Sequence, residues 1–234
     1  MLVLAIETST EQTAVALGSE QGIVGGITLA GAKPGDEAVV PAIEHLLQWS
    51  GSSPSSLSGV AVGLGPGLFT GMRVGIATGK ALAQSLHIPI VGLASLDVLA
   101  FSVAHTRRPI AAAVDAKRGE LFYAFYRPVP GGVTRETEFE VGPPQRLAAE
   151  LEARREDILM VGNGALANRR ELEAAGTHVE FAPAAYAFPA ATAMVELAIA
   201  RLSREDFDRV HELKPYYVRK SDAQIAWDHR RRTG

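Results

Sequence analysis

Short apolar runs alternate with polar turns along the first hundred residues. Leu2 to Ile6 and Thr13 to Leu17 are apolar runs on either side of the polar stretch Glu7-Thr8-Ser9-Thr10. This pattern predicts a β-hairpin with an acid and hydroxyls in its turn. Apolar runs bounded by glycine or proline predict further strands, and apolar residues at helical spacing predict helices. We expect strands at 22–29, 59–64 and 89–93, and helices at 36–50, 71–86 and 96–104, with Asp36 and Thr70 as helix caps.

The same order of elements starts again after residue 106. Ile110 to Val114 and Leu121 to Tyr126 flank a charged turn and predict a second hairpin. A loop is expected at 128–132, a strand at 158–161, and helices at 143–155 and 190–202. Two units that each open with a hairpin predict a duplicated α/β fold. We therefore divide the chain into lobes 1–106 and 107–234, with the last helix of the second packing back on the first.

Composition narrows the class of protein. The chain of 234 residues is 47% hydrophobic and 21% charged, with 23 Lys plus Arg against 26 Asp plus Glu, a net charge of -3. These values are typical of soluble globular proteins and exclude disordered and collagen-like chains. Cysteine is absent, which excludes disulfides, thiolate metal sites and cysteine nucleophiles. No targeting segment and no apolar run of about 18 residues is recognised, so we expect a cytoplasmic protein without a membrane segment.

Charge is distributed unevenly. Residues 1–105 carry ten charged side chains of the 49 that 23 plus 26 give, and the remaining 39 follow. A lobe with so few charges hides much of its surface or meets another protein there. The segment 219–234 is net basic, which is typical of a solvated end and leaves a nucleic-acid contact open.

The sequence lacks the residues that several kinds of catalytic site require. The six histidines are isolated in sequence, there is no GxSxG elbow, and Gly75 to Ala81 fails the spacing of a phosphate loop. The turn Glu7-Thr8-Ser9-Thr10 remains. An acid and hydroxyls between paired strands can hold a metal–nucleotide phosphate, but the glycine that permits close backbone approach is missing. A hydrogen-bonded hairpin without a ligand is the alternative.

Glycines recur every four residues in the predicted helix 71–86. Gly71, Gly75 and Gly79 form one stripe, although glycine costs about 1 kcal/mol relative to alanine inside a helix. Such a stripe lets another backbone approach closely. The approaching backbone belongs either to the same lobe or to a second subunit. The spacing of the glycines does not distinguish between these two interpretations.

Three segments resemble a known family. They are LAIETSTEQTAVAL, then GLGPGLFTGMRVGIATGKALA followed by IPIVGLASLDVLA, and AAVDAKRGELFYAFY. They are similar to the TsaB family, dimerisation subunits of the bacterial tRNA threonylcarbamoyladenosine system. PYYVR at 215–219 resembles a carboxy-terminal element of the family more loosely. The resemblance implies an actin-like (ASKHA, RNase H-like) fold of two lobes, with mixed sheets flanked by helices.

The resemblance also separates this chain from TsaD, the related transferase. TsaD has an HLEGH-like sequence whose histidines bind its metal, and here Ser95 and Leu99 occupy the two ligand positions. Leucine cannot coordinate a metal, so no metal and no other cofactor is expected. A His-Ser-Glu element of the family is replaced by Gly35-Asp36-Glu37.

These features predict a non-catalytic subunit that pairs with TsaD through its first lobe, or with itself when alone. TsaE would join the larger complex, and tRNA would be reached through that complex. The alternative is a free-standing kinase or ATPase that uses residues 7–10 and Asp115. The predicted contact residues lie on two helices and are Val39, Val40, Ile43, Leu47, Gly71, Arg73, Gly75 and Gly79.

Overall fold

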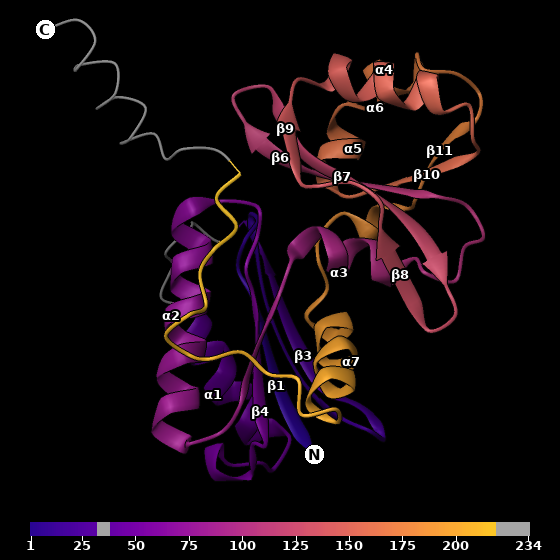
Figure 1. Ribbon diagram of the computed structural model, residues 1–234. Coiled ribbons are helices and arrows are strands. Elements are labelled where there is room, and N and C mark those ends of the chain that lie inside the picture. The colour runs from indigo at the N-terminus through magenta and orange to yellow at the C-terminus, as the bar shows by residue number, and fades with distance from the viewer. Residues whose placement is uncertain (32–37, 219–234) are drawn as a thin grey trace, which may run out of the picture.

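The computed structural model describes residues 1–31 and 38–218 and contains two β-sheets, each flanked by helices (Figure 1). The expected cap Asp36, the altered Gly35-Asp36-Glu37 element and the basic segment 219–234 lie outside the described residues. No helix in the described ranges is long and apolar enough to cross a bilayer.

The first sheet has the strand order β3-β2-β1-β4-β5. β1, β2 and β3 form an antiparallel meander, while β4 and β5 run parallel to β1. The strands are β1 (Leu2–Glu7), β2 (Gln12–Ser19), β3 (Gly22–Ala30), β4 (Gly59–Gly63) and β5 (Ile90–Leu93). Glu7 pairs with Ala14, so the sequence Glu7 to Thr10 closes the hairpin as predicted.

Alternation along β1 sorts the side chains onto two faces of this sheet. Leu4 and Ile6 point toward α1 (Val39–Trp49) and α2 (Phe69–Leu86). Val3 and Ala5 point toward α7 (Ala191–Leu202). β2 repeats this division, and alanines on its α7 side allow that helix to approach closely. The sheet is therefore covered on both faces, and its second helical layer comes from the far end of the described chain.

The second sheet repeats the first. Its order is β11-β10-β6-β7-β8, again an antiparallel meander extended by parallel strands, with β9 added to β7. Its strands are β6 (Ile110–Lys117), β7 (Glu120–Val129), β8 (Gly132–Arg135), β9 (Glu140–Gly142), β10 (Ile158–Val161) and β11 (Val179–Phe181). Helices α3 (Ser95–Ser102), α4 (Pro144–Arg154), α5 (Asn163–Ala167) and α6 (Arg169–Glu173) accompany it, with a short 3₁₀ turn at Ala184–Tyr186. A similar turn at Pro54–Ser56 precedes β4 in the first lobe. The predicted duplication is confirmed.

Two parts of the prediction need correction. The expected loop 128–132 is the tip of the β7–β8 hairpin. β8, β9, β11, α5 and α6 were missed because each is short and, unlike the equally short β10, is not a continuous apolar run. α3 was assigned to the first lobe, but Leu96 and Leu99 pack in the core of the second sheet with Ile110. The chain therefore passes from one sheet to the other at the start of α3.

The segment 203–218 returns from α7 along the first sheet. Asp208 bridges to Ile90 on the edge strand β5, and Leu213 is buried beside it. Tyr216 then donates its backbone N–H to the carbonyl of Leu64 and stacks edge-on against Phe139 of the second lobe, with ring centroids 5.2 Å apart. This segment covers a sheet edge and joins the two lobes.

Candidate functional site

The acid of the first hairpin turn is buried. Glu7 is 1% exposed, and its Oε1 accepts the N–H of Ser9 at 2.6 Å while its Oε2 accepts the hydroxyl of Ser95 at 3.0 Å. Burial raises the pKa of Glu7, against the hydrogen bonds from Ser9 and Ser95 that lower it. Gly63 on β4 leaves room for this carboxyl, since a Cβ there would lie 2.3 Å from Oε2. The carboxyl is therefore part of the packed interior.

The hydroxyls of the turn are also bonded within the chain. The Thr8 hydroxyl donates to the carbonyl of Gly71 at 2.7 Å, and the hydroxyls of Ser9 and Ser95 lie 2.7 Å apart. Thr10 accepts the backbone N–H of Gln12 at 3.3 Å. All four side chains of the sequence Glu7 to Thr10 are less than 9% exposed. A ligand would have to displace these bonds before it could contact the turn.

The glycine stripe of α2 packs on this turn. A Cβ on Gly71 would lie 2.0 Å from the carbonyl oxygen of Thr8, and one on Gly75 would lie 2.3 Å from the Thr8 hydroxyl. A Cβ on Gly79 would lie 2.2 Å from Val62 on β4. α2 begins at Phe69, two residues earlier than predicted, and its N-cap is Leu68 rather than Thr70, which lies inside the helix. Leu68 donates its backbone N–H to the carbonyl of Ser9 in the turn.

These distances correct the predicted contact surface. Gly71, Gly75 and Gly79 face their own sheet, so they are not available to a second subunit. Val39, Ile43 and Leu47 are likewise buried in the core of the first lobe, because the aliphatic face of α1 covers the sheet. Of the eight predicted contact residues, Val40 and Arg73 are exposed.

Adding one methyl group at Gly71 should destabilise the fold. The methyl of Gly71→Ala would meet a backbone oxygen, which cannot rotate away. Overpacking of this kind costs about 1–3 kcal/mol, so we expect the melting temperature to fall by roughly 3–10 °C. The matched control is Gly132→Ala, whose methyl would meet only Phe101 at 3.9 Å. Thermal denaturation of both variants tests this, and equal melting temperatures would contradict the packing described.

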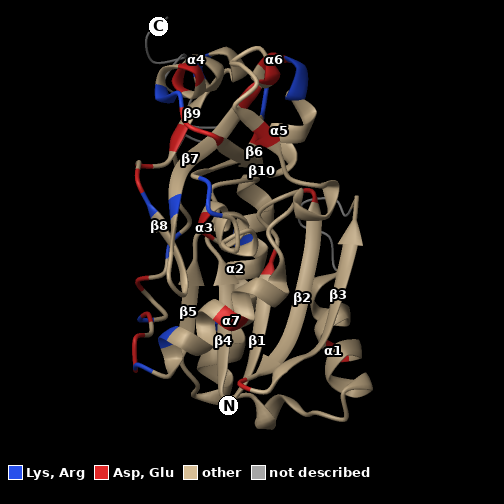
Figure 2. Ribbon diagram, turned by 90° about the vertical axis from the view of Figure 1, so that its right-hand side faces the viewer, with Lys and Arg blue, Asp and Glu red and all other residues tan. Residues whose placement is uncertain are grey.

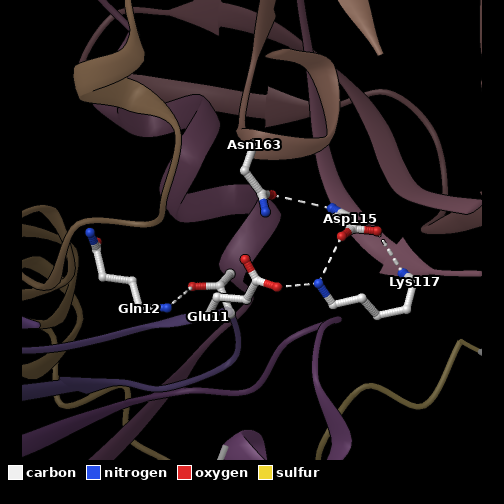
Figure 3. A network of polar contacts seen from close by, with 6 residues as sticks. Glu11, Gln12, Asp115, Lys117 and Asn163 are labelled. Carbon is white, nitrogen blue, oxygen red and sulfur yellow. Dashed lines mark hydrogen bonds and ion pairs between the residues drawn. The ribbon is translucent and has the colours of Figure 1, made fainter. Parts of the chain in front are cut away.

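The turns of the two hairpins face one another across the lobes (Figure 3). Lys117, from the second hairpin, forms an ion pair with Glu11 of the first and another with Asp115, where its Nζ lies 2.9 Å from Oδ2. The hydrogen bonds to Glu11 and then to Asp115 raise the pKa of Lys117. Asn163 accepts the N–H of Asp115 at 3.2 Å. Asp115 thus lies on the turn that faces the first hairpin, but its carboxylate is paired with Lys117 within the chain.

The outer surfaces of α1 and α2 carry few charges. Val40 is 51% exposed and Trp49 is 73% exposed. The exposed positions of the two helices are Val40, Pro41, Glu44, His45, Gln48 and Trp49 on α1, and Thr70, Arg73, Ala77, Ala81, Gln84 and Ser85 on α2. Only Glu44 and Arg73 in this set have a full charge. We call this set the α1–α2 face, and Figure 1 shows the two helices on the same side of the first sheet.

Arg73 is held at one end of the α1–α2 face by aromatic residues. Its guanidinium lies 3.8 Å from the ring centre of Phe69, and its Nε donates to the hydroxyl of Tyr217 at 3.1 Å. Tyr217 stacks on Phe69 with centroids 5.3 Å apart. Tyr217 of the PYYVR sequence therefore contacts α2, although the two are far apart in the sequence.

The two positions at which the resemblance implies metal-binding histidines in TsaD are part of the interior here. Ser95 is fully buried and bonded to Glu7 and Ser9, and Leu99 is fully buried in the core of the second sheet. Within residues 1–31 and 38–218, no group of three His, Asp or Glu side chains is placed to hold a metal ion.

Solved structures with the same architecture include YeaZ from Pseudomonas aeruginosa. It superposes with a TM-score of 0.79 at 26% identity, covering 92% of this chain and 99% of that one. A ROK hexokinase from Thermus thermophilus, at 12% identity and a TM-score of 0.51, shares the fold alone. Two sheets of matching order with facing hairpin turns place the chain in the actin-like (ASKHA) class.

Sequence comparison identifies the family within this class. Residues 30–227 match the profile described as "TsaD: tRNA N6-adenosine threonylcarbamoyltransferase". The tRNA threonylcarbamoyladenosine biosynthesis protein TsaB of Bacillus subtilis is 32% identical over 97% of this chain and 98% of its own length. Its namesake in Escherichia coli is 27% identical over 97% of both. The chain belongs to the TsaB family.

Proposed function

We propose that this chain is a non-catalytic subunit that pairs with TsaD. The pair would support threonylcarbamoyl transfer to adenosine 37 of tRNAs that read codons beginning with A. One observation carries the proposal: the acid and hydroxyls of the first hairpin turn, which an actin-like enzyme would direct at a phosphate, are buried and bonded to their own chain. A free-standing kinase or ATPase would need this turn open to its substrate.

The positions related to the metal ligands of TsaD support the same conclusion. Ser95 holds the Glu7 carboxyl, and Leu99 fills a core. Neither side chain can be recruited to a metal without breaking the interior, because both are fully buried. Transfer chemistry is therefore assigned to the partner.

The α1–α2 face is the surface we assign to TsaD. It is exposed, has little charge to desolvate, and includes large apolar side chains at Val40 and Trp49. Figure 2 shows few Lys, Arg, Asp or Glu residues over the strands and helices of the first lobe. TsaD is related in sequence through the matched profile, so it could present an equivalent helix pair. Two copies of this chain would then compete with TsaD for one face, giving a homodimer when TsaD is absent.

The proposal includes the wider assembly. TsaE would join the pair in the cytoplasm, and tRNA would bind the complex more tightly than it binds this chain, whose net charge is -3. Phosphate contacts from Lys and Arg dominate such affinity.

An omission experiment tests the proposed function. TsaD, TsaE and tRNA are supplied with threonylcarbamoyl-adenylate, with and without this chain, and modified adenosine is measured by mass spectrometry of digested tRNA. We expect modification only when the chain is present. The chain without TsaD should give none. Modification by the chain alone would show that it is itself the transferase, and equal modification without it would remove the scaffold role.

A further inference from the structure

A pocket of about 360 Å³ lies between the lobes and is lined by α3, by α7 and by the β7–β8 hairpin (Figure 1). Among the described residues, none from the two facing hairpin turns lines it. Its volume is at the lower end of the ~300–1,000 Å³ typical of small-molecule sites. Leu93, Phe101 and Leu197 supply apolar walls. The pocket therefore has the size and the walls for a small ligand with an apolar body.

Positive side chains outnumber negative ones around this pocket. The lining has three of the first kind and one of the second, a net charge of 3 minus 1, or +2, from Arg135, Arg201, Arg204 and Asp97. Asp206 and Asp208 bind Arg201 but do not line the pocket, so they balance its charge without presenting a carboxylate to a ligand. An excess of guanidinium groups on the inner surface favours an anion.

Arg201 is held in place and still has a donor to spare. Its Nε and Nη2 each donate to one oxygen of Asp206, at 2.8 and 3.0 Å, and its Nη1 donates to the carbonyl of Gly92 at 3.0 Å. Nη1 also lies 3.4 Å from a carboxylate oxygen of Asp208. These contacts use at most four N–H groups of the five in a guanidinium. Because the side chain is already fixed, binding a ligand to it costs little further conformational entropy.

Arg204 is kept beside Arg201 by the turn that ends α7. Its backbone N–H donates to the carbonyl of Arg201 at 3.0 Å. Hydrogen bonds from Arg201 lower the pKa of Asp206 and the charge of Arg204 adds to this effect, but Arg201 already binds both oxygens of that carboxylate. The Arg204 side chain makes no hydrogen bond or ion pair with any residue in 1–31 and 38–218. Its guanidinium is therefore available to a ligand.

Asp97 limits which anions fit. Its Oδ1 accepts the hydroxyl of Tyr126 at 2.8 Å and lies 3.7 Å from the guanidinium of Arg135, so the positive charge of Arg135 is already balanced. A phosphate dianion would bring a second negative charge into a pocket that contains this carboxylate, which is unfavourable. A carboxylate ligand has a single charge and matches the planar fork of an arginine.

We propose that this pocket binds a small organic acid in its carboxylate form. The carboxylate would bind Arg204 and the remaining N–H of Arg201, and the apolar body of the acid would lie against Phe101 and Leu197. Phe101 belongs to α3 in the second lobe, while α7 packs on the first sheet, so the ligand would join the two lobes. The site includes no residue of the α1–α2 face, and the proposal does not depend on pairing with TsaD.

Calorimetric titration of the full chain at neutral pH with 4-methylpentanoate and 3-phenylpropionate tests the proposal. The matched probes are 3-phenylpropanamide, which has no charge, 3-phenylpropylamine, which has a positive charge, and inorganic phosphate. We expect both acids to bind, and the amide and the amine to bind at least about tenfold more weakly, the effect of one charge-assisted hydrogen bond. Phosphate or the amine binding more tightly than the acids, or no binding of either acid below about 10 mM, would overturn it.

Variants locate the binding and separate charge from packing. Arg204→Gln should weaken 3-phenylpropionate at least about tenfold and leave the affinity for the uncharged amide unchanged. Ala200→Phe, at an exposed position on α7 that lines the pocket, should abolish binding of both by filling the space. Arg209→Gln is the control, since Arg209 is exposed and does not line the pocket. Circular dichroism confirms that each variant is folded. Unchanged affinity for the acid in folded Arg204→Gln would contradict the assigned anion contact, and unchanged affinity in folded Ala200→Phe would show that the acid binds elsewhere.

Discussion

Replacing Val40 with glutamate should abolish pairing with TsaD and reduce tRNA modification to the level seen without this chain. Val40 lies on the exposed side of α1, opposite the residues that cover the sheet. In the free chain the new carboxylate would stay in water, so the fold should be intact. In the complex it would be buried without a partner, which costs several kcal/mol, and an affinity loss of at least about 100-fold is expected.

The matched control is Val129→Glu, which makes the same change at a 41% exposed position in the second lobe. Sedimentation with TsaD and the modification assay are run on both variants, with circular dichroism as a check on folding. The control should behave as the unmodified chain. If Val40→Glu is folded and still supports modification, the α1–α2 face is not the contact with TsaD.

The architecture could be predicted from the sequence because its longer strands and helices have regular patterns of apolar and polar residues. The apolar alternation of β1 and β2, the helical spacing of 71–86 and the second hairpin all appear where expected. Elements of three to five residues, such as β9, β11, α5 and α6, carry too few positions for a period to emerge. The sequence also did not show that the first lobe ends before α3. This helix has apolar residues on more than one side and could pack on either sheet.

The contact surface was harder to predict than the fold. Glycine at every fourth position indicates that another backbone approaches α2 closely. It does not indicate whether that backbone belongs to the same chain or to a partner. Here it is the turn at Thr8. The aliphatic face of α1 posed the same ambiguity, and its own sheet covers it. The exposed side of both helices, which we propose as the contact with TsaD, includes Ala77 and Ala81 and gives no strong hydrophobic signal in the sequence.

The roles of Ser95 and Lys117 could not be read from sequence for a different reason. Ser95 lies 88 residues from Glu7, and Lys117 lies 106 residues from Glu11. The bond between Ser95 and Glu7 forms only when the start of α3 lies beside the first turn, and the pair of Lys117 with Glu11 forms only when the two hairpins face each other. Both turns had been recognised as polar, and the missing information was that their polar groups satisfy one another.

Removing the Glu7 side chain should be strongly destabilising. In Glu7→Ala the N–H of Ser9 and the hydroxyl of Ser95 would lose their acceptor in the interior, and a cavity would open beside Gly63. Unsatisfied buried donors cost about 1–3 kcal/mol each, so we expect a loss of roughly 3–5 kcal/mol and a fall in melting temperature of about 6–20 °C. Glu7→Gln keeps an acceptor and nearly the same volume, so it should lose much less. Urea denaturation at one pH measures both, and equal losses would assign the effect to charge rather than to the hydrogen bonds.

The same residue should make stability depend on pH in a direction that the structure fixes. Burial raises the pKa of Glu7 above its ordinary value of 4.5, so the folded chain keeps this proton at pH values where the unfolded chain has released it. Between those two pKa values the folded state binds more protons, and its free energy of unfolding falls as the pH rises. Glu7→Gln does not titrate at this position, while every other group is common to both proteins. The free energy of unfolding of the unmodified chain minus that of Glu7→Gln should therefore be highest below pH 4.5 and decrease above it, reaching a constant value once the folded carboxyl has ionised. A difference that increases with pH would mean that the hydrogen bonds from Ser9 and Ser95 outweigh burial, and that Glu7 is a stabilised anion in the folded chain.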